Sequence, residues 1–229
     1  MKRLWIAFFC VALVTIQLSA QKKTTLKTQK EKISYIIGTD IGKNLKKQAI
    51  DVNPDLFFKG IKDAFAGEKF LLTDQEIQEV MGAFQQEMMA KQSEKTSKLS
   101  AANKKEGEAF LDANKKKDSV VTLPSGLQYK VVVEGTGKTP TANDTVTTHY
   151  RGTLVDGTEF DNSYKRGEPA TFPVNGVIAG WTEALQLMKA GSKWKLYIPS
   201  NLAYGDRGAG QLIGPGATLI FDIELISVK

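Results

Sequence analysis

The stretch TVTTHYRGTLVDG, residues 145–157, decides how the C-terminal half of the chain folds. Alternate residues of this stretch share a face of an extended strand. One face carries Val146, Thr148, Tyr150, Gly152 and Leu154, and the other carries Thr147, His149, Arg151 and Thr153. Asp156 and Gly157 follow as a signal for a tight hairpin turn. The pattern therefore predicts a strand over 145–154 that buries one face and belongs to an antiparallel sheet.

The rest of residues 119–229 repeats this style, with short alternating runs between Gly and Pro residues. Further strands are predicted over Leu127–Val133, 193–198 and 219–225. In the second of these, Tyr197 falls on the polar face together with two lysines. One short helix, Trp181–Met188, interrupts the strands. We expect an α+β domain in which a curved antiparallel sheet wraps on one helix.

Residues 21–118 follow a helical pattern instead. Apolar residues three and four apart predict a first amphipathic helix, and they are Ile33, Ile36, Ile37, Ile41 and Leu45. Asn53 as N-cap and Pro54 at the first helical position open a second helix, which Gly67 ends. Thr73 and Glu76 have the spacing of a capping box and predict the start of a third helix.

The third helix is predicted to be unusually long. After Met89 its apolar stripe fades, yet helix-forming residues continue to Lys117. About 40 helical residues would span about 60 Å. A helix that is polar all round usually crosses solvent between domains, and we expect this of its second half. The first two helices are too short to bury much alone, so we expect a homodimer held through residues 33–89.

The N-terminus has the pattern of a secretory signal peptide. Lys2 and Arg3 precede a mostly apolar run to Leu18, and a small residue, Ala20, stands before the predicted cleavage point. An uncleaved N-terminal anchor is the alternative. We therefore divide the chain into a signal peptide at 1–20, a helical dimerisation region at 21–72, a linking helix at 73–118 and a C-terminal domain at 119–229.

Composition excludes several classes of function. The chain has one Cys and one His, too few for a zinc finger, an iron–sulfur site or a disulfide framework. Removal of residues 1–20 would leave no cysteine, which suits an oxidising compartment. Residues 21–118 carry 19 Lys and no Arg among 15 acidic residues. Such interspersed charge is typical of a solvated helix face, and we expect no nucleic-acid partner.

Four segments in the C-terminal half resemble the FKBP family of peptidyl-prolyl isomerases in order and spacing: HYRGTLVDGTEFDNSY (149–164), VIAGWTEALQLMKAG (177–191), LAYGDRGAG (202–210) and TLIFDIELISV (218–228). Nearer the N-terminus, SYIIGTDIGKNL (34–45) and the long Lys-rich helix resemble the dimeric, exported branch typified by the macrophage infectivity potentiator proteins. The resemblance covers nearly all of the chain after residue 20.

The resemblance implies an aromatic pocket for a prolyl peptide, with no cofactor and no metal. Its walls would be Tyr150, Phe160, Phe172, Val177, Ile178, Ile213 and Phe221, with Trp181 as the floor. Asp161 would be buried at the edge, paired with Arg166 and near Tyr204. The Tyr204 hydroxyl and the Ile178 N–H would bind the substrate carbonyls. The implied catalytic residues are thus Asp161, Tyr204, Tyr150 and Phe160.

The resemblance also implies a biological setting. Partners would be unfolded or partly folded proteins that contain proline, and inhibitors would include tacrolimus or rapamycin. The compartment would be the periplasm of a Gram-negative bacterium, with the outer-membrane surface as a second possibility. The alternative function is that of a chiefly non-catalytic dimeric chaperone, which would hold unfolded clients without isomerising them.

Overall fold

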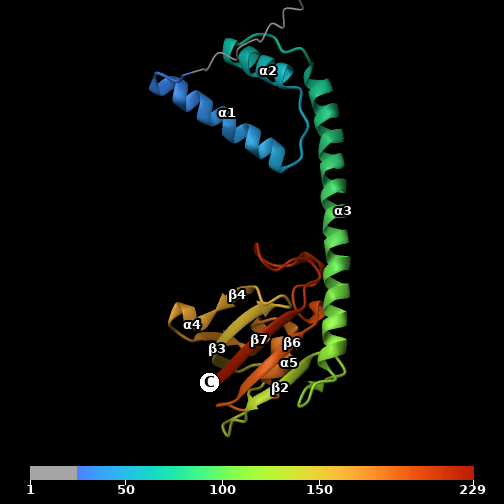
Figure 1. The fold of residues 1–229 in the computed structure, drawn as a ribbon, viewed down its shortest axis with the longest axis vertical. Coiled ribbons are helices and arrows are strands. Elements are labelled where there is room, and N and C mark those ends of the chain that lie inside the picture. The colour runs from blue at the N-terminus through green and yellow to red at the C-terminus, as the bar shows by residue number, and fades with distance from the viewer. Residues whose placement is uncertain (1–24) are drawn as a thin grey trace, which may run out of the picture. The chain divides into compact units, whose positions relative to one another are not determined.

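The computed structural model describes residues 25–229, so the predicted signal peptide lies outside the described residues. The described chain forms two compact units, one before residue 74 and one from Asp74 to the C-terminus (Figure 1). The mixed α and β content expected from the sequence is confirmed. The four domain limits proposed above stay a prediction.

The first unit consists of helices α1 (Gln29–Lys47) and α2 (Pro54–Ala66). The predicted start of α2 is confirmed, because the Asn53 side chain accepts hydrogen bonds from the amides of Asp55 and Leu56. Gly67 ends this helix in the left-handed conformation, with φ of 68°. Such a φ is easy only for a residue without a Cβ, so glycine is the natural residue at this end.

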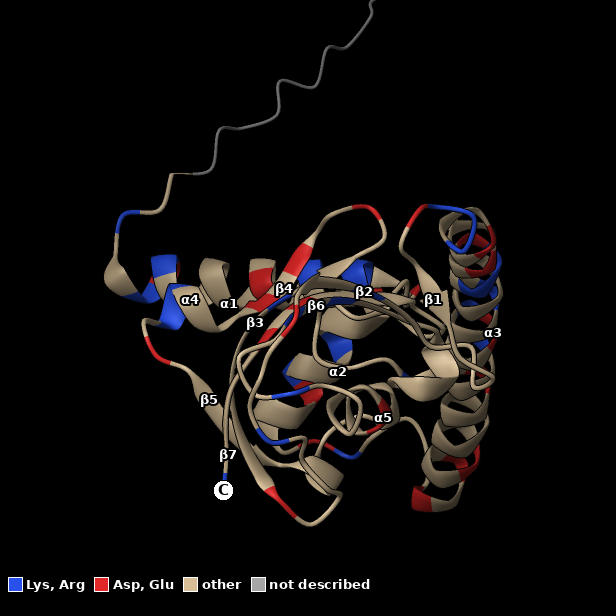
Figure 2. Ribbon diagram, turned by 90° about the horizontal axis from the view of Figure 1, so that it is seen from below, with Lys and Arg blue, Asp and Glu red and all other residues tan. Residues whose placement is uncertain are grey.

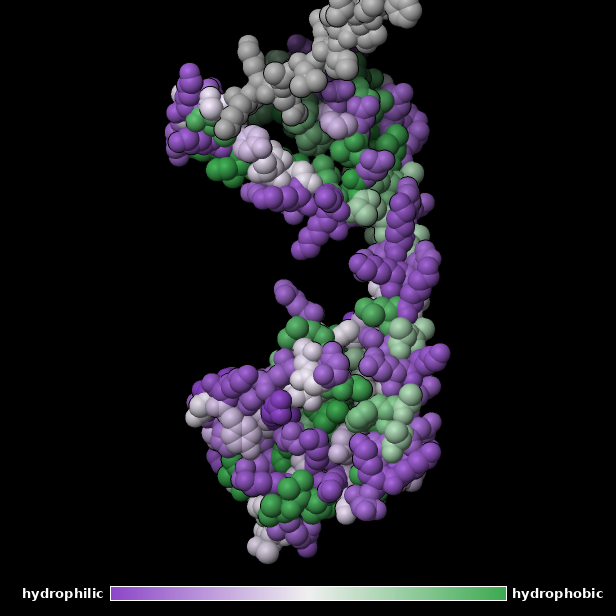
Figure 3. All heavy atoms as spheres, in the orientation of Figure 1, coloured by the Kyte–Doolittle hydropathy of each residue, from purple (hydrophilic) through white to green (hydrophobic). Residues whose placement is uncertain are grey.

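The two helices of the first unit leave large apolar side chains in contact with solvent. No residue of α1 is buried, and Asp63 is the single buried residue of α2. Figure 3 shows hydrophobic residues on the surface of both helices. The most exposed are Tyr35, Ile36, Ile37, Leu56, Phe58 and Phe65. This unit therefore presents more apolar surface than its own packing covers.

The second unit is built on a seven-stranded antiparallel sheet. Its strands are β1 (Val121–Thr122), β2 (Gln128–Val133), β3 (Thr145–Leu154), β4 (Glu159–Asn162), β5 (Ala170–Pro173), β6 (Lys193–Ile198) and β7 (Leu219–Val228). The order is β1-β2-β6-β7-β3-β4, and β5 also pairs with β3. The predicted bounds of β3 are those observed. The sequence reasoning missed three short strands, β1, β4 and β5.

Strand β3 organises the sheet. Along one edge it pairs with β7, and its first and last thirds pair with β5 and β4 respectively. The short helix α4 (Ser163–Arg166) connects β4 to β5. Irregular pairing interrupts the contacts of β3 with both β4 and β7, and such bulges increase bend and twist. The sheet is thereby curved, with its apolar face on the inside.

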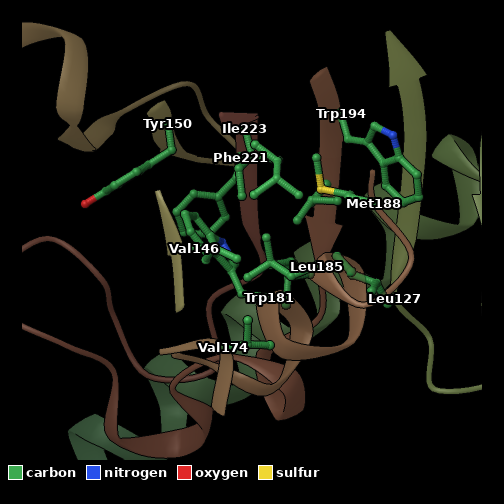
Figure 4. Packing of buried hydrophobic residues seen from close by; sticks show 14 of the residues in the cluster. Leu127, Val146, Tyr150, Val174, Trp181, Leu185, Met188, Trp194, Phe221 and Ile223 are labelled. Atoms are coloured by element: carbon green, nitrogen blue, oxygen red, sulfur yellow. The ribbon is translucent and has the colours of Figure 1, made fainter. Parts of the chain in front are cut away.

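Helix α5 (Ala179–Leu185) lies against the inside of the curved sheet (Figure 1). It begins two residues earlier than predicted and ends three residues earlier. The amides of Leu187 and Met188 still bond to the Ala184 carbonyl as a turn, so Met188 remains fully buried. Figure 4 shows Leu185 and Met188 packed toward Leu127 and Trp194, and Trp181 lying toward Tyr150 and Phe221.

Two three-residue turns of 3₁₀ helix border the C-terminal part of the sheet, and a third precedes α5. They are η1 (Val174–Gly176), η2 (Ser200–Leu202) and η3 (Gly205–Arg207). The sequence reasoning did not anticipate them, because such short turns carry no periodic pattern.

Helix α3 (Asp74–Asn114) is continuous for 41 residues, close to the predicted length. The expectation that its second half is solvated is wrong. Ser100, Gly107 and Asn114 are buried residues of this half, which packs on the sheet domain. Acidic and basic residues are interspersed along the helix (Figure 2). The buried residues of the contact face are small or carry an amide, so the sequence shows no continuous apolar stripe there.

Three contacts join the C-terminal end of α3 to the sheet. The Asn114 side-chain amide donates to Gln128 Oε1 over 2.9 Å, and Gln128 Nε2 donates to the Leu111 carbonyl over 3.0 Å. The ring of Phe110 packs on Tyr197, with centroids 5.9 Å apart. The helix thus covers Tyr197, which the alternation had assigned to the polar face of its strand.

Gly107 generates a stability prediction. A Cβ at this position would lie 2.1 Å from Thr218 Oγ1 and 3.0 Å from Thr218 Cβ. We expect Gly107→Ala to destabilise the second unit by about 1–3 kcal/mol through overpacking. Urea unfolding followed by tryptophan fluorescence measures this.

Gly82 supplies the matched control, because a Cβ there meets nothing within 4 Å. Gly82→Ala on the same helix should stabilise it by about 0.5–1 kcal/mol. Adding Thr218→Ala to Gly107→Ala should recover part of the loss. Equal effects of the two glycine variants would contradict close packing at Gly107.

Candidate active site

An open cavity of about 860 Å³ lies on the inner side of the curved sheet. Ten of the eleven predicted site residues line it: Tyr150, Phe160, Asp161, Phe172, Val177, Ile178, Trp181, Tyr204, Ile213 and Phe221. Arg166, the eleventh, reaches the rim from α4 through its bonds to two of these residues. The structure thus brings the whole predicted set together, whereas the role of each residue stays a prediction.

Five further residues line the cavity and were not predicted: Gly176, Ala209, Gly210, Gln211 and Leu212. Ala209 and Gly210 fall within the segment 202–210 that carried part of the family resemblance. The four residues at 209–212 lie between Tyr204 and Ile213 in sequence, and Gly176 directly precedes Val177. This proximity to predicted site residues was the signal that could have found them. Alternation gives no such signal in a loop.

Trp181 forms the base of the cavity. Its side chain is only 4% exposed. The rings of Tyr150, Phe172 and Phe221 meet it nearly edge-on, at centroid distances of 5.1, 5.8 and 5.2 Å. Edge-to-face contacts are a favoured geometry for aromatic pairs. Among the described residues the indole Nε1–H of Trp181 has no hydrogen-bond partner.

Gly152 of β3 lets two aromatic walls close on each other. A Cβ at this position would lie 2.5 Å from the Phe160 ring and 2.9 Å from the Phe221 ring. These two rings meet edge to face with centroids 5.5 Å apart. The sequence reasoning assigned Gly152 to the core face but not to the site. A glycine inside a strand often marks such a close approach, and this was the missed signal.

The polar rim of the cavity centres on Asp161. Its carboxylate accepts from the Tyr150 hydroxyl over 2.5 Å and from the Asn162 amide over 2.8 Å. Arg166 donates to the same carboxylate through Nη1 and to the Tyr150 hydroxyl through Nη2, the latter over 2.9 Å. The expected pairing of Asp161 with Arg166 is present. The expected burial is wrong, because the Asp161 side chain is 40% exposed.

This arrangement fixes the protons of two rim groups. Burial raises the pKa of the Tyr150 phenol, and the adjacent Asp161 carboxylate raises it further. The hydrogen bonds that Arg166 makes with Tyr150 and Asp161 raise the pKa of its guanidinium above the usual value. Tyr150 therefore stays a neutral donor at physiological pH, and Arg166 stays a cation.

Two donors at the cavity are not engaged by the protein. The Tyr204 side chain is 42% exposed, and among residues 25–229 its hydroxyl has no hydrogen-bond partner. Ile178 is the N-cap of α5, and its amide has no backbone acceptor within the described chain. Both groups remain available to a bound ligand.

His149 lies on the opposite face of β3 from Tyr150, as the alternation predicted. Its Nδ1 is 3.0 Å from Ser163 Oγ, and its ring stacks on Tyr164 at a centroid distance of 4.4 Å. The single histidine of the chain therefore does not line the cavity.

A curved antiparallel sheet wrapped on one helix, with an aromatic cavity and hydrogen-bonding groups at its rim, matches a known class of enzyme. Residues 136–226 match the family described as FKBP-type peptidyl-prolyl cis-trans isomerase. Residues 30–131 match the domain described as amino terminal to this isomerase. The chain therefore belongs to the FKBP-type peptidyl-prolyl cis-trans isomerase family, and the resemblance seen in the sequence is confirmed.

Individual relatives extend this match over most of the chain. The outer membrane protein MIP of Legionella longbeachae is 53% identical, over 93% of this chain and 91% of that protein. The peptidyl-prolyl cis-trans isomerase Mip of Coxiella burnetii is 45% identical, over 100% of this chain and 99% of that protein. The crystal structure of FkpA from Escherichia coli has a TM-score of 0.70 at 41% identity, covering 90% of this chain and 99% of that one.

Two features are absent from the described residues. Between residues 25 and 229, no helix is both long and apolar enough to cross a membrane. The same part of the chain has no cluster of three or more His, Cys, Asp or Glu side chains that could hold a metal ion.

The rim chemistry generates a pH prediction. Because the raised pKa values of Tyr150 and Arg166 keep both groups protonated, neither loses a proton between pH 6 and pH 8. We expect kcat/KM for a short proline peptide to vary by less than about twofold over this range. A protease-free isomerisation assay measures it, with circular dichroism to show that the fold persists. A bell-shaped profile centred near pH 7 would contradict the prediction.

Proposed function

We propose that this isomerase speeds the folding of exported proteins by non-covalent catalysis in the aromatic cavity. The observation that carries the proposal is the base of the cavity, where three aromatic rings surround Trp181 below a rim of hydrogen-bonding groups. A prolyl ring fits an apolar base, and the flanking peptide carbonyls need donors at the rim.

The energetic demand on such a site is modest. Rotation about a prolyl amide has a barrier of about 18–20 kcal/mol and takes tens of seconds without help. About 5–6 kcal/mol of transition-state stabilisation would bring it to roughly a hundred events per second. No bond is made or broken, so neither a nucleophile nor a proton shuttle is needed. Differential binding of the twisted amide is sufficient.

Two physical effects would supply this stabilisation. The planar amide is more polar than its twisted form, so transfer into an apolar cavity favours the twist. The Tyr204 hydroxyl and the Ile178 amide would hold substrate carbonyls in the orientation that the twist requires. In this proposal Tyr150 and Phe160 shape the wall around the twisting bond, and Asp161 contributes negative charge at the rim, oriented by Arg166 and Tyr150.

The same cavity is proposed to bind tacrolimus or rapamycin. Its volume of about 860 Å³ falls within the range of drug-sized sites. Competition by either compound in the peptide assay tests this directly.

Export is proposed from residues 1–20 and is consistent with a relative named as an outer membrane protein. We place the protein in the periplasm of a Gram-negative bacterium, with the outer-membrane surface as the alternative. An intact mass that begins near Gln21 in the soluble envelope fraction would support the periplasm. A mass that begins at Met1 would favour an anchored protein.

We also propose a homodimer held through residues 33–89. The first unit exposes a set of large apolar side chains, among which Phe65 is 91% exposed. Between α1 and α2 there is also an apolar hollow lined by residues that include Leu45, Ile50 and Phe57. Monomeric soluble proteins rarely expose large contiguous apolar patches to solvent.

A dimer would link two isomerase cavities. A long unfolded client could engage both, and linkage of this kind raises avidity by about 10²–10⁴ when both sites can bind at once. A short peptide would gain nothing. The alternative, a chiefly non-catalytic chaperone, predicts that clients benefit even when the cavity is disabled.

The cavity is tested by two variants. We expect Tyr204→Phe and Asp161→Leu each to lower kcat/KM for a short proline peptide by about 10- to 100-fold, or about 1.4–2.7 kcal/mol. The fold should survive because both side chains are about 40% exposed. Tyr164→Phe makes the same chemical change as Tyr204→Phe on the face away from the cavity, and it should leave activity unchanged. Full activity in both cavity variants would refute the proposed site.

The dimer is tested by Ile37→Glu combined with Phe65→Glu in the chain that starts at Gln21. Association would bury two unpaired carboxylates in the proposed interface, which is costly. Light scattering should therefore report a dimer for the parent protein and a monomer for the variant. Lys43→Gln with Lys62→Gln changes the net charge by the same amount at polar positions and should remain dimeric.

The monomeric variant also separates the two candidate functions. It should isomerise a short peptide like the parent but speed the refolding of a proline-limited protein less well. If the Tyr204→Phe variant, still a dimer, speeds refolding as well as the parent protein does, the result supports the chaperone alternative and contradicts a role for catalysis in refolding.

A further inference from the structure

The segment 203–217, here called the pocket loop, supplies a large part of the cavity wall. Tyr204 lies near its start, and Ala209–Ile213 form its tip beside the cavity. The loop contains five glycines, of which four, Gly205, Gly208, Gly210 and Gly216, have positive φ. Glycine-rich backbone has many alternative conformations, so its native shape depends on outside support.

Few bonds within the loop hold that shape. The backbone of Ala209 pairs with that of Ile213, and the Gly216 amide donates to the Gly205 carbonyl over 2.8 Å. The Ala217 amide also donates to the Gly214 carbonyl over 3.3 Å, and Ala203, Ile213 and Ala217 pack against the core. The side-chain hydrogen bonds to the loop come from helix α3, which lies more than a hundred residues earlier in the sequence.

The first support from α3 acts on η3, the turn that follows Tyr204. The Asp206 carboxylate accepts from Ser100 Oγ over 2.5 Å, and Lys104 Nζ lies 2.5 Å from the same oxygen, Asp206 Oδ1. The bonds from Lys104 and then Ser100 lower the pKa of Asp206, so the carboxylate is charged at neutral pH. Asp206 is two residues from Tyr204, and its position constrains that of the tyrosine backbone.

The second support acts on the far end of the loop. Asn103 Nδ2 donates to the Pro215 carbonyl over 2.8 Å. A Cβ at Gly216 would lie 2.6 Å from the Ser100 carbonyl, which shows how closely the loop backbone approaches the helix. Residues within about one turn of α3 therefore contact the pocket loop near both of its ends.

We propose that Ser100, Asn103 and Lys104 are positioning residues for the isomerase cavity, which they serve by fixing the pocket loop and with it Tyr204. The inference rests on the proposed function of the cavity. Misplacement of a substrate-binding group by about 1 Å can cost up to about 100-fold in rate. Helix α3 is then part of the catalytic unit as well as a link to the first unit.

The contacts are suited to positioning more than to stability. The side chains of Lys104 and Asp206 are 43% and 66% exposed, and exposed ion pairs contribute little to folding. Loss of this ion pair should therefore leave the midpoint of unfolding nearly unchanged while activity falls. This separation distinguishes positioning from a general structural role.

The test compares two double variants in the full chain from Gln21. Ser100→Ala with Lys104→Ala should lower kcat/KM for a short proline peptide by about tenfold, and Asn103→Ala should lower it in the same direction. Ser97→Ala with Lys105→Ala removes the same two side-chain types at exposed positions of α3 that form no contact with the loop, and it should retain full activity. Thermal unfolding is recorded for every variant.

A charge exchange provides the readout that a merely structural role would not give. Lys104→Glu and Asp206→Lys should each lower activity, and the two together should restore most of it, because the ion pair reforms with its signs reversed. Amide NMR shifts of Tyr204, Gly208 and Gly210 should move in the single variants and return in the exchange. Unchanged activity and shifts in Ser100→Ala with Lys104→Ala would overturn the inference.

Tyr204→Phe separates this inference from the proposed function. If Tyr204→Phe lowers activity but the α3 variants do not, the cavity is the site and the positioning role is wrong. If Tyr204→Phe has no effect, the proposed function fails and the positioning role fails with it.

Discussion

The enclosure of the Trp181 indole by three aromatic rings is the constraint on which the second unit depends. The rings come from β3, β5 and β7, so the indole must be met by three different strands at once. Only a strongly curved sheet brings these strands around one helix, and Gly152 provides the space in which Phe160 and Phe221 meet. The packing that stabilises the core also forms the base of the cavity. Any change that relaxes this cluster therefore alters stability and site together.

Helix α3 shows how a polar helix can still be an integral part of a domain. Its contact face includes a glycine and a serine, which allow close approach, and two asparagines whose side-chain NH2 groups donate to the sheet domain. Such a face has no hydrophobic periodicity, but it is specific, because each amide needs its own partner. The consequence for function is that the pocket loop, the most glycine-rich part of the cavity wall, is supported by a helix from the N-terminal half of the chain.

The first unit follows a different physical logic. Its two short helices are capped by local signals, at Thr28 for α1 and at Asn53 for α2, so the sequence near each cap sets where the helix begins. Their apolar side chains nevertheless remain exposed, since two helices of this length cannot enclose a core. Apolar surface without cover within one chain is the physical basis for the proposed association of two copies.

The sequence by itself determined the elements whose signals are local. Alternation gave the bounds of β3, and the N-cap and glycine signals gave those of α2. The family resemblance assembled the aromatic and rim residues, all of which meet at one cavity. What only the tertiary structure decided were contacts between segments far apart in sequence: the packing of α3 on Thr218 and Gln128, the half-exposed state of Asp161, and the closeness that requires Gly152. The reason is that periodicity reports which face of an element is apolar, whereas docking through small and amide residues leaves the pattern unchanged.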